Sequence, residues 1–205
     1  MLMASRITIG PFVPEDFGPL FCWINDVATA QLDFAYRPVD MMAHRQWWDG
    51  LGKDPSKVMF AIRKTIEPLI IGFVQINAIN SVHRSAELGI RIGEEKNRGQ
   101  GYGKEALNLA VDYCWNHLNL NRVQLLVFRH NHRAIGAYKA AGFKKEGVLR
   151  KAAFIGGEWV DLVLMASLRP AKTRRKQRLA PIVHFLPDKP ALAEGKGAEV
   201  RRRIA

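Results

Sequence analysis

The chain has 205 residues, of which 48% are hydrophobic and 24% are charged, and its formal net charge is +12 at pH 7. This length suits one ordinary domain with a sizeable core and room for a tail. No apolar run approaches the roughly 20 residues of a membrane-spanning helix, and the opening sequence, MLMASRITIG, lacks the long apolar segment of a secretory signal. We therefore expect a cytoplasmic protein without membrane association.

The first quarter of the sequence predicts one strand and two helices. Apolar and polar residues alternate along 6–13 (RITIGPFV), which is typical of a strand. Pro14 is a favoured residue for the first turn of a helix, and apolar residues follow it at helical spacing. Asp40 is a good N-cap for a second helix, MMAHRQWWDGLG at 41–52, which its glycines end.

Three strands follow these helices. The runs VMFAIRK (58–64) and PLIIGFVQINAI (68–79) are rich in β-branched and aromatic residues and flank a turn-like sequence, so they predict a hairpin. The run SAELGIRI (85–92) alternates and predicts a third strand. The second half then predicts a glycine-rich turn with a helix, a strand, a helix and two strands, at 98–118, 123–128, 133–142, 144–155 and 158–167.

The order of these elements, β-α-α-β-β-β-α-β-α-β-β, indicates the fold class. It predicts an α/β protein of the α+β type, with a mixed, mostly antiparallel central sheet of about seven strands flanked by about four helices. Regular patterning ends near residue 169. We predict one folded domain at 1–169 and a flexible, basic C-terminal tail at 170–205.

The positive charge is concentrated in that tail. Residues 170–205 carry ten Lys and Arg and three Asp and Glu, a net charge of +7, whereas residues 1–169 carry 21 and 16, a net charge of +5. The run RRKQR suits a weak contact with nucleic acid or the ribosome, although no aromatic residues are interleaved with it. A nucleic-acid-binding or ribosome-binding module without catalysis is therefore one hypothesis for the chain.

The two cysteines, Cys22 and Cys114, are too few and too far apart for a disulfide framework or a metal site. We expect both to be reduced and buried. His130 and His132 have no further Cys or carboxylate neighbours in the sequence, so they do not indicate a metal site either. No metal is expected.

The segment RGQGYGK (98–104) packs three glycines between a strand and a helix. The first N–H groups of a helix have no internal partners, and the helix dipole attracts anions to that end. Glycine allows unusual backbone angles and lets phosphate oxygens come close. The segment lacks the Gly-Lys-Ser/Thr ending of a triphosphate loop and the third glycine of a dinucleotide loop. Alone, it indicates an anion site or a tight turn that binds nothing.

A second motif makes the pattern specific. Asn131, Tyr138, Gly142 and Phe143 lie in N-x-x-A-x-x-x-Y-x-x-x-G-F, one strand after R-x-x-G-x-G. Together the two motifs resemble the acetyl-coenzyme A (acetyl-CoA) signatures of the GNAT superfamily of N-acetyltransferases, and the resemblance covers about residues 5–168. The sequences SVHRSAELGIRIGEE and GYGKEA look most like the branch with ribosomal-protein N-terminal, spermidine and amino-sugar acetyltransferases.

The resemblance implies acetyl-CoA as co-substrate and direct attack on it by a primary amine, with no acyl-enzyme intermediate. The strand end near Ile92 would separate from its neighbour and pair with the pantetheine arm, and Asn131 would hydrogen-bond that arm. Arg98 would add positive charge beside the pyrophosphate. Backbone amides of the glycine segment would hold the pyrophosphate itself, from Gly99, Gln100, Gly101, Tyr102, Gly103 and Lys104.

The same resemblance places Tyr138 near the thioester sulfur. A phenol has an ordinary pKa near 10, so it is protonated at neutral pH and suits a general acid that protonates the leaving thiolate. The alternative is a ring that only orients the cofactor. Glu87 is the candidate base for the substrate ammonium, or else a group that only binds the amine. His83 is a second candidate base, and a solvated loop histidine is its alternative.

The acceptor pocket is expected to involve the first two helices and the final strand pair. Trp47 and Trp48 cannot both face the core, because adjacent helical residues lie about 100° apart. One of the two is expected to line the pocket, or else to lie on the surface. The residues expected near the acceptor are Asp33, Phe34, Tyr36, Trp47, Trp48 and His83.

The acceptor itself stays open between classes of amine. The main interpretation is a protein N-terminal amine or a small-molecule amine, and an amino sugar or a polyamine is the alternative. A net positive domain argues mildly against a polycation such as spermidine. A family member that binds CoA without catalysis is a further hypothesis. The sequence is compatible with a monomer and with a homodimer.

Overall fold

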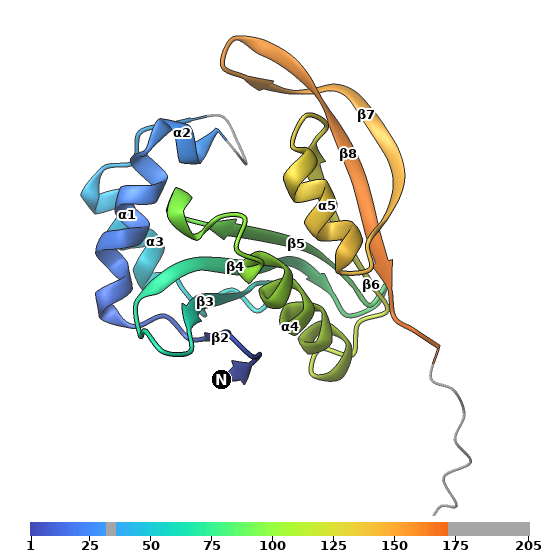
Figure 1. The fold of residues 1–205 in the computed structure, drawn as a ribbon, viewed down its shortest axis with the longest axis horizontal. Coiled ribbons are helices and arrows are strands. Elements are labelled where there is room, and N and C mark those ends of the chain that lie inside the picture. Colours follow the sequence, from blue (N-terminus) through green and yellow to red (C-terminus); the bar gives the residue numbers. More distant parts are fainter. Residues whose placement is uncertain (32–35, 172–205) are drawn as a thin grey trace, which may run out of the picture. The chain divides into compact units, whose positions relative to one another are not determined.

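The computed structural model describes residues 1–31 and 36–171, and residues Met1–Pro170 form one compact unit. The described chain contains an eight-stranded sheet and five α-helices (Figure 1). The strands are β1 (Leu2–Met3), β2 (Ile7–Gly10), β3 (Val58–Lys64), β4 (Ile70–Asn80), β5 (Ser85–Ile92), β6 (Arg122–Phe128), β7 (Lys144–Ile155) and β8 (Glu158–Leu168). The helices are α1 (Phe17–Asn25), α2 (Val27–Ala30), α3 (Met41–Asp49), α4 (Tyr102–Asn116) and α5 (His132–Ala140), with 3₁₀ turns η1 (Pro14–Asp16) and η2 (Glu95–Asn97).

The sheet is mixed and mostly antiparallel, as predicted. Its strand order is β1-β2-β3-β4-β5-β6-β8-β7, and β5 with β6 is the one parallel pair within the described sheet. About seven strands and four helices were expected. The additional elements are β1, with two residues, and α2, with four, both too short to give a periodic pattern.

The two faces of the sheet carry separate apolar clusters. On β3, Ile62 belongs to the larger cluster, and its neighbour Ala61 belongs to the smaller one, because successive strand residues point to opposite faces. Helices α4 and α5 cover the larger cluster and lie side by side over that face (Figure 1). Leu20 and Trp23 of α1 form the smaller cluster with the opposite face.

Local sequence explains why α4 and α3 form where they do. The buried residues of α4 recur at helical spacing and form one face of the helix. Asp40 caps α3 as expected, since its side chain accepts the N–H groups of Met42 and Ala43 at 2.9 Å each. The buried face of α4 is Ala106, Leu107, Ala110, Val111, Cys114 and Trp115.

The central strands β5 and β6 separate part-way along their length. Their pairing ends at Glu87 and Gln124. On their other sides, β5 continues to pair with β4 as far as Ile92, and β6 continues to pair with β8 as far as Phe128. The sheet therefore opens between 88–92 and 125–128, where the facing backbone edges do not pair with each other. Buried backbone groups need partners, so such an opening suits a ligand with amide groups.

The prediction that both cysteines are buried is wrong for Cys22, which is exposed. Leu20 and Trp23 form the buried face of α1, which packs against the sheet. Cys22 lies on a different face of the helix. Cys114 is buried in α4, and its burial raises the pKa of the thiol to about 12. Within 1–31 and 36–171, no helix is long and apolar enough to cross a bilayer.

Candidate active site

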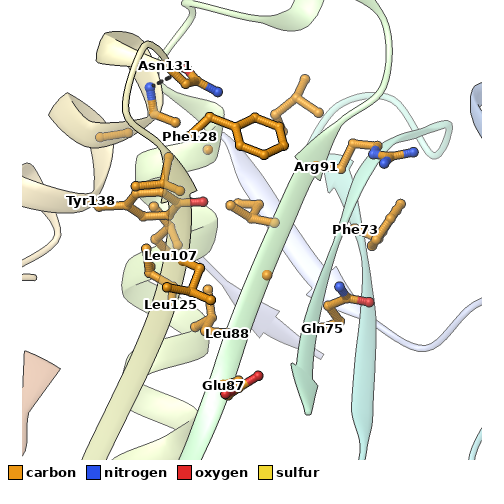
Figure 2. Close-up of a pocket in the computed structure, with 18 of the residues that line it drawn as sticks. Phe73, Gln75, Glu87, Leu88, Arg91, Leu107, Leu125, Phe128, Asn131 and Tyr138 are labelled. Carbon is orange, nitrogen blue, oxygen red and sulfur yellow. Dashed lines mark hydrogen bonds between the residues drawn. The ribbon is translucent and has the colours of Figure 1, made fainter. Parts of the chain in front are cut away.

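A cavity of about 1200 Å³ lies at the opening between β5 and β6 (Figure 2). Both faces of the sheet contribute to it. Leu88, Leu125 and Tyr138 belong to the cluster under α4 and α5, and the neighbouring Glu87 and Gln124 point to the opposite face. The cavity therefore connects the two faces. The predicted site residues that line it are Trp47, Glu87, Ile92, Arg98, Gly99, Gly101, Gly103, Lys104, Asn131 and Tyr138.

The glycine segment forms the turn that begins α4. Gly99 and Gly101 have φ angles of 76° and 87°, which L side chains rarely adopt. The N–H of Glu105 makes the first helical bond, to the Gly101 carbonyl at 3.2 Å. The backbone N–H groups of the residues before Glu105 have no carbonyl partner within the helix. A helix offers such N–H groups to an anion as hydrogen-bond donors. The geometry suits a pyrophosphate.

The Arg98 guanidinium makes structural hydrogen bonds beside this turn. Its Nε donates to the Ile92 carbonyl at 3.1 Å, and its Nη2 donates to Thr29 Oγ1 at 3.0 Å and to the Gly93 carbonyl. These bonds hold the end of β5 against α2. The Ile92 carbonyl keeps a second lone pair, so the predicted pairing of this strand end with a pantetheine arm stays compatible with the structure.

Asn131, the N-cap of α5, and Tyr138, within α5, both line the cavity. The Asn131 Oδ1 caps the helix by accepting the Ala134 N–H at 3.0 Å, which assigns the NH₂ group as the donor that remains at the cavity wall. Tyr138 is 7% exposed, and its ring packs edge-on against Phe143 with centroids 5.9 Å apart. Figure 2 shows the Tyr138 hydroxyl directed away from α5 and into the cavity. A phenol is thus presented to any ligand in the opening.

The opposite face of the cavity is rich in amide side chains. Glu87 pairs across the sheet with Asn77 on β4 and with Gln124 on β6, and Gln75 pairs with Gly89, so these residues share one face. All of them line the cavity. The sequence interpretation missed the three amides. Their signal was the alternation of polar residues within the apolar runs VQIN and RVQLLV, but only the strand register brings them together.

Glu87 is held by a chain of side chains on this face. Gln124 Nε2 donates to Glu87 Oε1 at 3.2 Å, and Gln124 Oε1 accepts from Arg122 Nη2 at 3.1 Å. Arg122 also makes a two-bond ion pair with Glu146, at 2.9 and 2.6 Å. This pairing raises the pKa of Arg122 and lowers that of Glu146. Because a guanidinium only donates, it fixes the Gln124 amide with its NH₂ group toward Glu87.

The aromatic residues of α3 take different positions. Trp48 packs against the cluster of Leu20 and Trp23, whereas Trp47 is 39% exposed, stacks on His44 at 5.2 Å and lines the cavity. His44 is a cavity residue that the sequence interpretation missed. It is buried, and its Nε2 lies 3.1 Å from the Phe17 carbonyl.

Besides Trp48, four predicted residues within the described chain do not line the cavity, namely Tyr102, His83, Tyr36 and Gln100. Tyr102 instead has its ring under the Arg6 guanidinium. His83 is exposed in the turn between β4 and β5, where its N–H donates to Asn80 Oδ1 at 2.7 Å. Tyr36 is half-buried and lies outside the cavity lining. Gln100 meets Arg6 through its carbonyl. Asp33 and Phe34 lie outside the described residues. No cluster of three or more metal-ligating side chains occurs in the described part of the chain.

Comparison with known proteins places the chain in a family. Residues 6–144 match the sequence profile of the acetyltransferase (GNAT) domain. The chain belongs to the GNAT acetyltransferase family. The resemblance inferred from the two motifs is thus confirmed.

Several relatives of this GNAT chain have named activities. Spermidine N(1)-acetyltransferase of Vibrio cholerae is 36% identical over 108 residues, which is 53% of this chain and 62% of that protein. The Escherichia coli K12 protein of the same name is 39% identical over 94 residues, 46% of this chain and 50% of the relative. The matched segments therefore span about half to three fifths of these curated relatives. An L-amino acid N-acetyltransferase of E. coli K12 is 31% identical over 102 residues, 49% of this chain and 62% of the relative.

A solved structure extends the similarity over most of the GNAT chain. The spermidine N-acetyltransferase from V. cholerae in complex with CoA and spermine aligns with a TM-score of 0.74 and 27% identity, over 80% of this chain and 96% of that one. This alignment confirms the predicted fold class. Glu87 is the single carboxylate among the described residues that line the cavity of the present chain. The cationic lining residues are Arg91, Arg98, Lys104 and Arg133.

Proposed function

We propose that this chain is an acetyl-CoA-dependent N-acetyltransferase that acts on a primary amine. The observation that carries the proposal is the cavity between β5 and β6. It joins the anion-binding start of α4 and the Tyr138 phenol, on one face of the sheet, to the Glu87 carboxylate on the other. A thioester and an amine can therefore meet in the opening from opposite sides.

The residues of the first face fit acetyl-CoA. N–H groups at the start of α4 would bind its pyrophosphate, with Lys104 adding positive charge at the cavity wall. The unpaired backbone edge at 88–92 would pair with the pantetheine amides, and the Asn131 NH₂ group would donate to that arm. When bound, the cofactor supplies an acetyl group activated as a thioester.

The chain then contributes two proton transfers. Glu87, oriented by Gln124, accepts a proton from the substrate ammonium directly or through water, which frees the lone pair of the amine for attack on the acetyl carbonyl. Tyr138 donates its phenolic proton to the departing thiolate as the carbon–sulfur bond breaks. Direct attack requires no enzyme nucleophile, so neither Cys22 nor Cys114 is needed in that role.

A polyamine is the acceptor that the relatives favour. Proteins named spermidine acetyltransferases match both in sequence and in fold, which supports this alternative over the protein N-terminal amine of the main sequence interpretation. Met59, Phe73 and Trp47 also line the cavity and offer apolar contacts to an aliphatic chain. Glu87 would hold the reacting ammonium.

A second candidate, an N-terminal peptide amine, is favoured by one observation. The acceptor face offers three amide side chains and one carboxylate among the described lining residues. Amides bind peptide groups by hydrogen bonds, whereas each further ammonium of a polyamine needs a negative partner. An acceptor with one ammonium and several polar groups therefore also fits.

A substrate screen tests both candidates. Thiol release from acetyl-CoA is measured with spermidine, spermine, peptides with free N-termini and amino sugars, and Glu87→Gln is the control. We expect the highest kcat/KM with spermidine and loss of that rate in Glu87→Gln. A higher kcat/KM with a peptide would replace the polyamine by the second candidate. CoA binding without thiol release for any amine would contradict the enzymatic proposal and favour a binding module.

A further inference from the structure

Arg6, which immediately precedes the strand β2, reaches across to the turn that begins α4. Its Nε and Nη2 each lie 2.6 Å from Glu105 Oε1, and its Nη1 donates to the Gln100 carbonyl at 2.9 Å. The backbone N–H of Arg6 donates to Glu105 Oε2 at 3.2 Å. One guanidinium therefore joins a strand, the first turn of a helix and the backbone of the glycine turn.

The glycine turn is shaped around this arginine. A side chain at Gly101 would place its Cβ 2.7 Å from Arg6 Nη2, so the absence of a side chain there makes room for the guanidinium. The Arg6 guanidinium also lies over the Tyr102 ring, 5.3 Å from its centroid. Both glycines line the cavity, but at Gly99, in contrast to Gly101, a Cβ would meet nothing within 4 Å. The turn thus has one side held by Arg6 and one side open.

The positive charge of Arg6 also affects the electrostatics at the start of α4, through Glu105. Glu105 lies in the first turn of α4, beside the N–H groups that we assign to a pyrophosphate. Its carboxylate is 18% exposed, and it would repel an anion at that helix end if it were not neutralised. The ion pair with Arg6 provides the neutralisation. The guanidinium that hydrogen-bonds to the turn therefore also offsets the negative charge of the Glu105 carboxylate.

We propose that Arg6 is a positioning residue that fixes the glycine turn in its pyrophosphate-binding conformation and neutralises Glu105. This inference rests on the proposed function. Arg6 acts through the backbone of Gln100 and through Glu105, and it contacts neither the acetyl group nor the amine. Loss of Arg6 should therefore weaken cofactor binding and spare the chemical step.

Direct titration with CoA and steady-state kinetics test this role. We expect Arg6→Ala to weaken CoA binding by about tenfold, the effect of losing hydrogen bonds to a charged group. The KM for acetyl-CoA should rise by the same factor, whereas kcat and the KM for the amine change by less than about twofold. Adding Glu105→Gln to Arg6→Ala should recover part of the affinity, because it removes the uncompensated carboxylate.

Two further variants keep the test decisive. Arg84 is a matched control, since it also donates to a backbone carbonyl and a side chain, both of Asn119, at 2.7 and 2.8 Å, and Arg84→Ala should bind CoA like the wild type. Arg6→Lys keeps the charge without the planar fork and should lose affinity several-fold, about threefold or more. Wild-type affinity in folded Arg6→Ala or Arg6→Lys protein overturns the proposal. Failure of the wild type to bind CoA refutes the proposed function instead.

Discussion

At the scale of single residues, the glycines of the turn before α4 differ in what occupies the space where a side chain would lie. Gly101 accommodates Arg6, whereas the space beside Gly99 opens on the cavity. The segment RGQGYGK therefore combines an internal packing demand at Gly101 with open space at Gly99. Both positions also need a positive φ, which the sequence could suggest only through the choice of glycine.

Tyr138 gives the sharpest prediction at this scale. Tyr138→Phe keeps the ring that packs on Phe143 and removes the proton donor, so we expect turnover to fall by about 100-fold or more with little change in CoA affinity. Tyr113→Phe is the control, because Tyr113 packs against Phe60 at 5.0 Å and lies outside the cavity lining. A wild-type kcat in Tyr138→Phe would remove the phenol from the acid role.

At the scale of elements, function depends on where one element ends and the next begins. The helix start of α4, the end of β5 and the cap of α5 all meet at the cavity. A side-chain hydrogen bond holds each of them in place. Arg6 bonds to the turn before α4, Arg98 bonds to the end of β5, and Asn131 caps α5. The backbone groups that we propose to bind the cofactor are in this way positioned before it binds, which lowers the entropy cost of binding.

The turn before α4 yields a prediction at this scale. Gly101→Val should abolish measurable CoA binding, because a β-branched residue at a φ of 87° is strained by about 1–3 kcal/mol and its Cβ would displace Arg6. Calorimetric titration measures the affinity, and circular dichroism confirms folding. Gly136→Ala in α5, where a Cβ meets nothing within 4 Å, is the control and should bind CoA normally. Normal affinity in Gly101→Val would refute the assignment of the pyrophosphate site.

At the scale of the whole molecule, the predicted boundary near residue 169 can be tested by truncation. Residues Met1–Pro170 contain every element of the described sheet and all the described residues that line the cavity. A chain that ends at Pro170 should therefore keep the thermal midpoint, kcat and KM of the full chain. Lost activity would show that the segment 171–205 takes part in the enzyme.

The same truncation tests the contact with nucleic acid. The segment 170–205 carries a net charge of +7. We expect the full chain to be retained on immobilised DNA at low salt and the truncated chain to elute earlier, because phosphate contacts are lost with the basic residues. Equal retention of the two chains would contradict a role of the tail in this contact.

Much of the fold could be predicted because the elements are long and periodic. The predicted strands at 58–64, 85–92 and 144–155 coincide with β3, β5 and β7. The two missed elements, β1 and α2, are short and depend on pairing or capping by other segments. Cys22 was misplaced because burial depends on which side of α1 faces the sheet, and a nine-residue helix leaves that side poorly defined.

The sequence by itself determined the family and the fold class, because those features reside in local motifs and in periodicity along the chain. The same motifs predicted the cofactor-side residues. Only the tertiary structure decided which side chains line the proposed acceptor side of the cavity and which of them hold one another in place. Gln124 reaches Glu87 through strand register, and Arg6 reaches Gln100 across a separation of 94 residues. Such contacts follow from packing between distant segments, and no local pattern in the sequence encodes them.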